Sequence, residues 1–388
     1  MNVRMLVRTL ARAFPLVVAC AATATLAQPI RIGAFLSVTG PAAFLGDPEQ
    51  KTLEMYVERI NAAGGIDGRK LELVRRNDNS DPAQAAKEIR GFAADDSIVG
   101  AVGPTGSAAV LAAKPVIESL KLPMVSSVSA AALSEPPVQW WFRSIAKDTQ
   151  QTQGVMNFIK SAGKTKIGLL YATDPFGQSG AEQFKKEAPA MGLTITSAQS
   201  YPLDTTDPSV QVAKVQATHP DAYIIWDGTS EARLALALKT LKSQGSGDAP
   251  VLLPESATSS AFTKAAGAAA NGAFYFAFLA PEDPKPGAQA DFVKEWQATH
   301  DGLPDDSNAM GYAAMSVVVK GLTDLASAKK PITRENLRDA IQAIKGFDAT
   351  TGTMNFGPGK PDPIALSDVQ INTIENGTTK RASPSDVK

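Results

Sequence analysis

Small hydroxyl side chains follow two neighbouring apolar runs in the first half of the chain. The segment Gly103-Pro104-Thr105-Gly106-Ser107-Ala108-Ala109 comes after residues 98–102, and Ser127-Val128-Ser129 comes after residues 123–126. A helix is expected to follow each segment, so free backbone amides and the Ser107 hydroxyl can bind an anion at a helix N-terminus. Ser107 can also act as a helix N-cap, and the two roles are compatible. Neither segment has the glycine–lysine signature of a phosphate loop, which favours a carboxylate as the anion.

Acidic residues follow three apolar runs in the second half of the chain. Asp174-Pro175-Phe176-Gly177 comes after residues 166–171, Asp227-Gly228 after residues 223–226, and Glu255 after residues 251–253. An acidic group that faces hydroxyl and amide loops across a cleft would suit a zwitterion, with its carboxylate on one side and its ammonium on the other. Three alternatives stay open: Asp174 and Asp227 as turn or capping residues, Glu255 as a solvated loop residue, and Phe176 as a core residue.

Continuously apolar runs alternate with segments of helical period, and this alternation predicts the fold. One helix, for example, carries apolar residues at i, i+3, i+4 and i+7 before it stops at Gly64-Gly65, namely Leu53, Tyr56, Val57 and Ile60. Such strands, separated by single amphipathic helices, indicate an α/β protein with parallel sheets covered on both faces. Two doubly wound units are predicted, at roughly 28–145 and 146–272, with the remaining chain completing both. In open sheets of this kind ligands bind beyond the carboxyl ends of the strands, where the polar segments lie.

The composition excludes several classes of function. The 388 residues include 38 basic and 39 acidic side chains, so there is no basic excess for binding nucleic acid. One cysteine and two histidines cannot supply a disulfide framework or a usual zinc site, and His219 and His300 lie in polar, turn-like contexts. We therefore expect no metal, no cofactor and no catalytic residues.

The first 27 residues have the pattern of an export signal. Three arginines precede the apolar residues 14–26, and Thr25-Leu26-Ala27 has the small-x-small form of a leader-peptidase site. Cleavage there would remove the only cysteine and place the protein in the periplasm. The alternative is a lipobox at Val17-Val18-Ala19-Cys20, which would anchor the chain through a lipid on Cys20.

A series of short motifs, in order along the chain, resembles one family. The motifs are Ile32-Gly33-Ala34-Phe35, Thr39-Gly40-Pro41-Ala42-Ala43, Asn61-Ala62-Ala63-Gly64-Gly65-Ile66-Asp67-Gly68, Phe142-Arg143, Asp174-Pro175-Phe176-Gly177, Asp221-Ala222, Gly311-Tyr312-Ala313-Ala314 and Thr351-Gly352-Thr353-Met354-Asn355-Phe356. Together they resemble the periplasmic solute-binding proteins of branched-chain amino-acid-type ABC transporters, the leucine-binding-protein-like family. The resemblance spans essentially all of the chain after residue 27.

This resemblance implies a type I periplasmic binding fold, with two doubly wound lobes joined by three crossovers and closing on a ligand by a hinge motion. The implied lobes are residues 28–145 with 275–362, and residues 146–274 with 363–388. The implied function is that of a carrier, not an enzyme: a monomer that captures a small amino-acid-like solute and delivers it to an ABC permease. Two alternative functions are compatible with the same fold. The protein could bind an aromatic carboxylate or amide, or it could act as a ligand sensor for a membrane partner.

The resemblance also assigns site residues. Ser107 corresponds to the serine that contacts the ligand carboxylate. Val128 and Ser129, or Ala130 if the alignment shifts by one, correspond to positions that give backbone and hydroxyl contacts. Phe176 and Gly228 fall at or near positions where amino-acid binders often have tyrosine. Glu255 corresponds to the acid that takes the ligand ammonium.

A hydrolase is the remaining alternative from a different class. Gly177-Gln178-Ser179-Gly180-Ala181 approaches a G-x-S-x-G nucleophile elbow, but its last position is alanine. Neither histidine is placed in a credible triad order with Ser179, which leaves the serine without a base.

Overall fold

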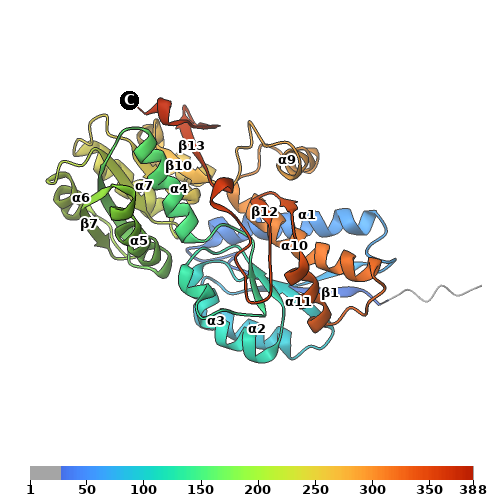
Figure 1. Cartoon of the computed structure of the whole chain (residues 1–388). Helices are drawn as coiled ribbons and strands as arrows, with labels where there is room; N and C mark the ends of the chain where they lie inside the picture. Colours follow the sequence, from blue (N-terminus) through green and yellow to red (C-terminus); the bar gives the residue numbers. More distant parts are fainter. Residues whose placement is uncertain (1–27, 388) are drawn as a thin grey trace, which may run out of the picture.

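The structure, a computed structural model, describes residues 28–387 and has two lobes, each built around one β-sheet (Figure 1). In the view of Figure 1 one lobe holds the blue, cyan and orange-red segments, and the other holds mainly the green and yellow segments. We call these the first and the second lobe. The expected export signal and the lipid anchor at Cys20 lie outside the described residues.

The first lobe contains a five-stranded parallel sheet with the order β2-β1-β3-β4-β5. Its strands are β1 (Ile30–Leu36), β2 (Leu71–Asn77), β3 (Ile98–Val102), β4 (Met124–Ser126) and β5 (Trp141–Arg143). The helices of this lobe are α1 (Ala43–Ala62), α2 (Pro82–Ala93), α3 (Ser107–Leu120), α10 (Asp306–Ser327) and α11 (Arg334–Ala343). Helix α1 packs on α10, and α10 packs on α11, so segments far apart in sequence complete this lobe.

The second lobe contains a seven-stranded sheet with the order β14-β13-β10-β9-β8-β6-β7. Its strands are β6 (Lys166–Ala172), β7 (Thr194–Tyr201), β8 (Ala222–Trp226), β9 (Val251–Leu253), β10 (Phe274–Ala277), β13 (Gln370–Glu375) and β14 (Thr378–Arg381). Strands β6 to β10 are parallel, whereas β13 and β14 add antiparallel pairs at one edge. The helices of this part of the chain are α4 (Asp148–Ser161), α5 (Pro175–Glu187), α6 (Ser209–Gln216), α7 (Glu231–Ser243) and α8 (Ser260–Ala266).

The chain passes between the two sheets three times. It leaves the first sheet after β5, returns after β10 through α9 (Ala288–Thr299) to α10, and enters the second sheet again at β13 after the hairpin β11 (Phe347–Ala349) and β12 (Gly352–Met354). The predicted fold class is therefore confirmed. One expected boundary needs correction: residues 275–277 were assigned to the first lobe, but β10 pairs with β9 and β13 in the second sheet.

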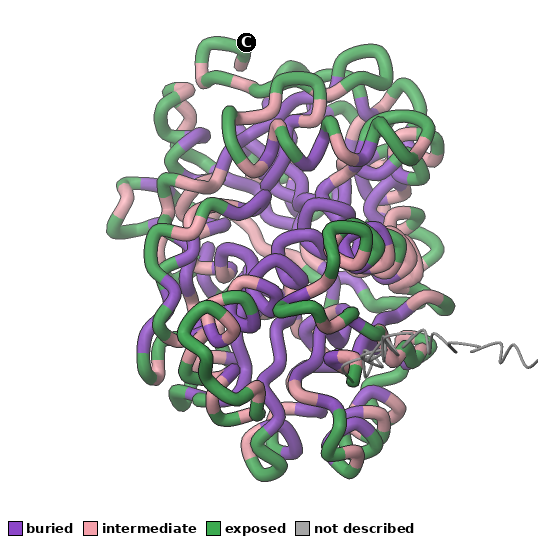
Figure 2. Tube along the Cα trace, turned by 90° about the vertical axis from the view of Figure 1, so that its right-hand side faces the viewer, coloured by how far each residue is buried: buried purple, intermediate pink, exposed green. Residues whose placement is uncertain are grey.

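Apolar side chains make up most of the buried residues of both lobes. Figure 2 shows that the buried segments run through the interior and the exposed segments lie on the outside. The central strands are buried, and β8 and β9, for example, contain only buried residues, whereas the edge strands β2, β7 and β14 are largely intermediate or exposed. Within residues 28–387, no helix has both the length and the apolar character of a membrane span. The same residues contain no grouping of three or more acidic, histidine or cysteine side chains that could hold a metal ion.

Candidate ligand-binding site

A small cavity lies where loops of the two lobes meet, beyond the carboxyl ends of strands in both sheets. Its volume is about 30 Å³, which is room for water-sized molecules only, so a larger solute can enter only if the lobes move apart. Residues of the first lobe and of the segments that lead from it line one side, and residues of the second lobe line the other. They are Leu45, Glu49, Thr105, Gly106, Ser107, Ser127, Val128, Ser129, Ile145 and Met310 on one side, and Phe176, Gly228, Thr229 and Glu255 on the other.

The cavity brings together six of the seven residues predicted from sequence, which come from five separate segments of the chain: Ser107, Val128, Ser129, Phe176, Gly228 and Glu255. The seventh, Ala130, does not line the cavity. It is buried behind Ser107, and its backbone N–H donates to Ser107 Oγ over 3.4 Å. Ala130 therefore helps to orient the Ser107 side chain.

The wall contributed by the first lobe is made of hydroxyls at loop–helix junctions. Ser107 is the first residue of α3, so the free amides of that helix terminus lie beside its side chain. Ser127 Oγ lies 2.8 Å from Ser144 Oγ and donates to the carbonyl of Met310 over 3.1 Å. Ser129 is 2 % exposed, and its carbonyl accepts from the N–H of Asp148 over 2.9 Å. These groups provide several hydrogen-bond donors and no positive charge.

A fully buried arginine holds the backbone of this wall in place. Arg143, in β5, donates to the carbonyl of Val128 and, over 3.1 Å, to the carbonyl of Ala130. Its guanidinium also pairs with Asp362 at 2.8 Å and lies over the Trp141 ring. Burial alone would raise the pKa of Asp362, but the arginine outweighs it and the pKa is lowered. The loop that presents Val128 and Ser129 is thus fixed by a satisfied ion pair.

The wall contributed by the second lobe is aromatic and closely packed. Phe176, in the first turn of α5, stacks on Trp226 with the ring centroids 5.4 Å apart and the planes 5° from parallel. A Cβ atom at position 228 would lie 2.7 Å from Phe176 Cε1, well inside van der Waals contact. Phe176 and Gly228 are therefore a complementary pair: the ring occupies the space that a side chain at 228 would need. A side chain at position 228 would therefore require the ring of Phe176 to move.

Glu255 is the one charged side chain that the second lobe contributes to the cavity. It follows β9 and Pro254 as the first residue of the 3₁₀ turn η3 (Glu255–Thr258), is 7 % exposed, and its Oε2 has no hydrogen-bond partner. Burial raises the pKa of Glu255 from its ordinary 4.5 to about 7, because the charged form loses its hydration there. A buried carboxyl with an unused acceptor is a group that an incoming cation or hydrogen-bond donor can satisfy.

The other acidic residues considered from the sequence have structural partners. Asp174 caps α5 by accepting from the N–H of Gly177 over 2.8 Å. Asp227 pairs with Arg233 through two bonds of 2.6 and 2.7 Å. Ser179 donates to Asp148 and has no histidine beside it. Neither aspartate lines the cavity, which agrees with the capping and turn interpretation.

The sequence interpretation missed one charged residue of the cavity, Glu49. This residue lies in α1, is 4 % exposed, and accepts a hydrogen bond from the Thr105 hydroxyl over 2.9 Å. Burial raises its pKa to about 8, helped by nearby Asp78 and Asp305. The sequence does indicate that Glu49 is unusual, because it is four residues after Leu45 and four before Leu53, on the apolar stripe of the helix. An acidic residue at such a helical position is not found when only the residues that follow strands are considered.

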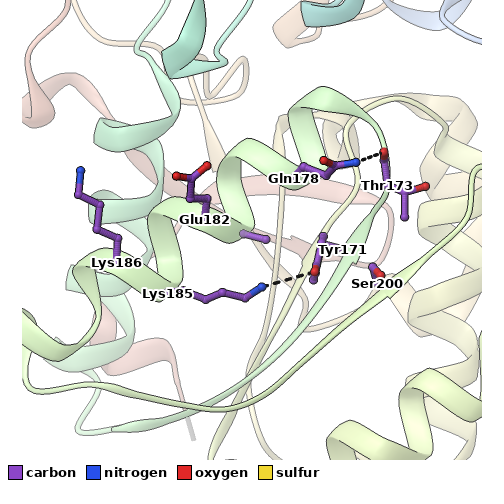
Figure 3. Close-up of a pocket in the computed structure, with 8 residues that line it drawn as sticks. Tyr171, Thr173, Gln178, Glu182, Lys185, Lys186 and Ser200 are labelled. Carbon is purple, nitrogen blue, oxygen red and sulfur yellow. Dashed lines mark hydrogen bonds between the residues drawn. The ribbon is translucent and has the colours of Figure 1, made fainter.

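A wider hollow of about 580 Å³ lies on the second lobe alone (Figure 3). It is lined mainly by α5 and by the ends of β6 and β7. Two of its polar side chains are hydrogen-bonded: Lys185 Nζ lies 3.4 Å from the Tyr171 hydroxyl, and Gln178 donates to the carbonyl of Thr173 over 2.5 Å. Since no buried polar group there lacks a partner, the cavity between the lobes is the stronger candidate site.

Comparison with known proteins places this geometry in one family. The sequence model of the periplasmic binding proteins matches residues 29–378. The chain is 27 % identical over 336 residues to a leucine-, isoleucine-, valine-, threonine-, and alanine-binding protein of Pseudomonas aeruginosa, covering 85 % of this chain and 86 % of that one. It is also 27 % identical over 391 residues to Leu/Ile/Val-binding protein homolog 7 of Brucella melitensis, and this match covers 90 % of this chain and 96 % of that one.

Solved structures show the same fold. An extracellular ligand-binding receptor from Rhodopseudomonas palustris HaA2 superposes with a TM-score of 0.82 at 23 % identity, covering 91 % of this chain and 99 % of that one. A leucine-binding protein from Thermotoga maritima superposes with a TM-score of 0.81 at 20 % identity, covering 92 % and 99 %. At these identities the likeness establishes the architecture of two lobes.

Proposed function

The chain belongs to the periplasmic binding protein family, and on that premise we propose that it captures a small amino-acid-like solute between its two lobes. Proteins of this family bind solutes and are not enzymes, so the hydrolase alternative is set aside. The proposal further holds that the solute is handed to an ABC permease, and that the protein works as a monomer in the periplasm.

The observation that carries the proposal is the unpaired carboxyl of Glu255 in a cavity whose other wall is rich in hydroxyls. An amino acid fits such a pair of walls. Its carboxylate can accept from the Ser107 and Ser129 hydroxyls and from the free amides at the start of α3. Its ammonium can donate to Glu255, which supplies the only negative charge on the wall of the second lobe.

Closure follows from this division of the contacts. In this proposal the first lobe pairs the ligand carboxylate and the second lobe pairs its ammonium, so the ligand is fully paired only when both walls touch it. A ligand that binds the closed form better than the open form shifts the population toward closure. The closed form is then the state that a permease would recognise.

The ionisation state of Glu255 should respond to the ligand. Without a cation beside it, the buried carboxyl has a pKa of about 7 and is largely neutral in mildly acidic solution. An ammonium within hydrogen-bond distance favours the charged form and lowers that pKa again. Binding of an amino acid therefore expels the proton from Glu255.

The proposal is tested by the thermal stability of the purified protein with a panel of amino acids and their des-amino analogues. A ligand at about 100 times its Kd should stabilise the fold by about 2.7 kcal/mol. Glu255→Gln should weaken binding of the amino acid more than binding of its des-amino analogue. The matched control is Glu182→Gln, an exposed glutamate on α5 of the same lobe, which should change neither. If no member of the panel raises the melting temperature, the proposal is wrong.

A further inference from the structure

A second carboxyl group lies in the same cavity, on the opposite lobe from Glu255. Glu49 belongs to the first lobe and lines the cavity together with Leu45, one turn earlier on α1. Its backbone position is fixed by a close approach of α10, since a Cβ on Gly311 would lie 2.8 Å from the Glu49 carbonyl oxygen. The carboxyl is therefore held at the cavity wall by the packing of two long helices.

The partners of Glu49 leave it able to accept another hydrogen bond. Its side chain has one hydrogen bond within residues 28–387, from the Thr105 hydroxyl to Oε2 at 2.9 Å. The Thr105 oxygen in turn accepts from the N–H of Ser37 over 3.3 Å, which orients the hydroxyl toward Glu49. No lysine, arginine or histidine of the described chain forms an ion pair with Glu49, and the charges that act on it, Asp78 and Asp305, are acidic.

Glu49 and Glu255 lie on opposite walls of the cavity. Glu49 is on the wall of the first lobe, where it pairs with Thr105, and Glu255 is on the wall of the second lobe. A ligand ammonium bound at Glu255 thus leaves Glu49 to meet another part of the ligand. Leu45 and Met310 line the wall on the same side as Glu49, so that part of the ligand meets two apolar side chains as well as the carboxyl.

We infer that the cavity selects a small amino acid whose side chain carries a hydrogen-bonding group, a hydroxyl or an amide, for Glu49. This inference rests on the proposed function and narrows its ligand class. A purely aliphatic side chain would cover the Glu49 carboxyl without pairing it, and a buried polar group left unpaired is costly. A side-chain donor satisfies the carboxyl at no change in volume.

The test compares amino acids of nearly equal shape that differ in the donor: threonine with valine, and asparagine with leucine. Binding is measured by calorimetry for the wild type, for Glu49→Met and for the control Glu58→Met, an exposed glutamate on the same helix. We expect the wild type to bind threonine and asparagine about tenfold or more tighter than their aliphatic counterparts. Glu49→Met should lose or reverse this preference, and Glu58→Met should keep it.

Each outcome separates the inference from the proposed function. If the wild type prefers valine and leucine, and Glu49→Met keeps that preference, the inference is overturned while capture of amino acids stands. If none of the four amino acids binds to the wild type, both fall together. Should Glu49→Met fail to fold, Glu49→Gln replaces it, because it keeps the volume and can still accept from Thr105.

For the Glu49→Gln variant, the test is the pH dependence of the binding affinities. The wild-type ratio of threonine to valine affinity should rise between about pH 7 and 9, as Glu49 ionises and becomes a stronger acceptor, and should stay constant in Glu49→Gln. A wild-type ratio that does not change with pH would overturn the inference.

Discussion

The two walls of the cavity are built on opposite plans. The wall of the first lobe presents hydroxyls on a backbone that is held by a buried ion pair, Arg143 with Asp362, and it also holds the Glu49 carboxyl, which pairs with Thr105. The wall of the second lobe presents a stacked aromatic surface, Phe176 on Trp226, and one carboxyl, Glu255, with an unpaired oxygen.

This difference suggests a separate role for each wall in ligand binding. In the proposed function, the backbone held by Arg143 is rigid and can orient a ligand carboxylate with little reorganisation. The unpaired oxygen of Glu255 gains a partner when the ligand arrives, which would favour closure. On this proposal the first lobe is the template for the ligand carboxylate, and the second lobe is the sensor of the ligand's positive end.

The largest effect on stability is expected from removing the arginine that holds the wall of the first lobe. Arg143→Met leaves Asp362 and two backbone carbonyls without their buried partner, which should lower the free energy of unfolding by about 3–5 kcal/mol. Urea denaturation measures the change. Arg90→Met, at an exposed arginine of α2 in the same lobe, should stay within about 0.5 kcal/mol of the wild type. Equal, small losses in the two variants would contradict the role assigned to Arg143.

The unpaired carboxyl of the sensor wall should show itself in the pH dependence of stability. The folded pKa of Glu255 lies above its ordinary 4.5, at about 7. Its protonated form therefore favours the folded state, and this contribution is complete below about pH 4.5 and lost as the pH rises to about 7. The shift corresponds to about 3 kcal/mol.

Glu255→Gln removes this titration. The difference in unfolding free energy between the variant and the wild type should grow by about 3 kcal/mol in favour of the variant between pH 4.5 and 7, and then level off. Denaturant titrations at a series of pH values measure it. A difference that is independent of pH would show that Glu255 is hydrated in the folded protein, and the contrast between the walls would be lost.

A smaller effect is expected from the aromatic packing of the second lobe. Gly228→Ala places a methyl group against the Phe176 ring and should destabilise the protein by about 1–3 kcal/mol. The double variant with Phe176→Leu should recover part of this loss, because the smaller side chain vacates the space. Thermal melts of the two single variants and the double variant measure the coupling. Additive losses would contradict the proposed complementarity of the two residues.

Much of the fold could be predicted from sequence because the central strands of both sheets are short apolar runs. β1, β3 and β9 lie where continuous hydrophobic residues indicated them. Strands β13 and β14 escaped prediction, since Gln370–Glu375 and Thr378–Arg381 are largely polar. β13 owes its place to pairing with β10, nearly one hundred residues earlier in the chain. Local pattern carries no information about such a partner.

The site was predictable to the extent that it lies in loops after strands. Ser107 and Glu255 could be found by reading the residues beyond each strand. Glu49 could not, because it reaches the cavity from the middle of a helix, and the packing of α1 on α10 decides where its carboxyl goes. The contact between Phe176 and Gly228 could not be predicted either, because the two residues are 52 positions apart and only the fold brings them together.

The most direct test of the central claim, that a ligand ammonium is received by Glu255, is the number of protons released on binding. It is measured by calorimetry at about pH 6 in buffers of different ionisation enthalpy, with an amino acid that binds. Since Glu255 has a pKa of about 7 in the free protein, the wild type should release close to one proton per ligand, and Glu255→Gln should release almost none. Equal proton release by both proteins, or none by either, would contradict the account.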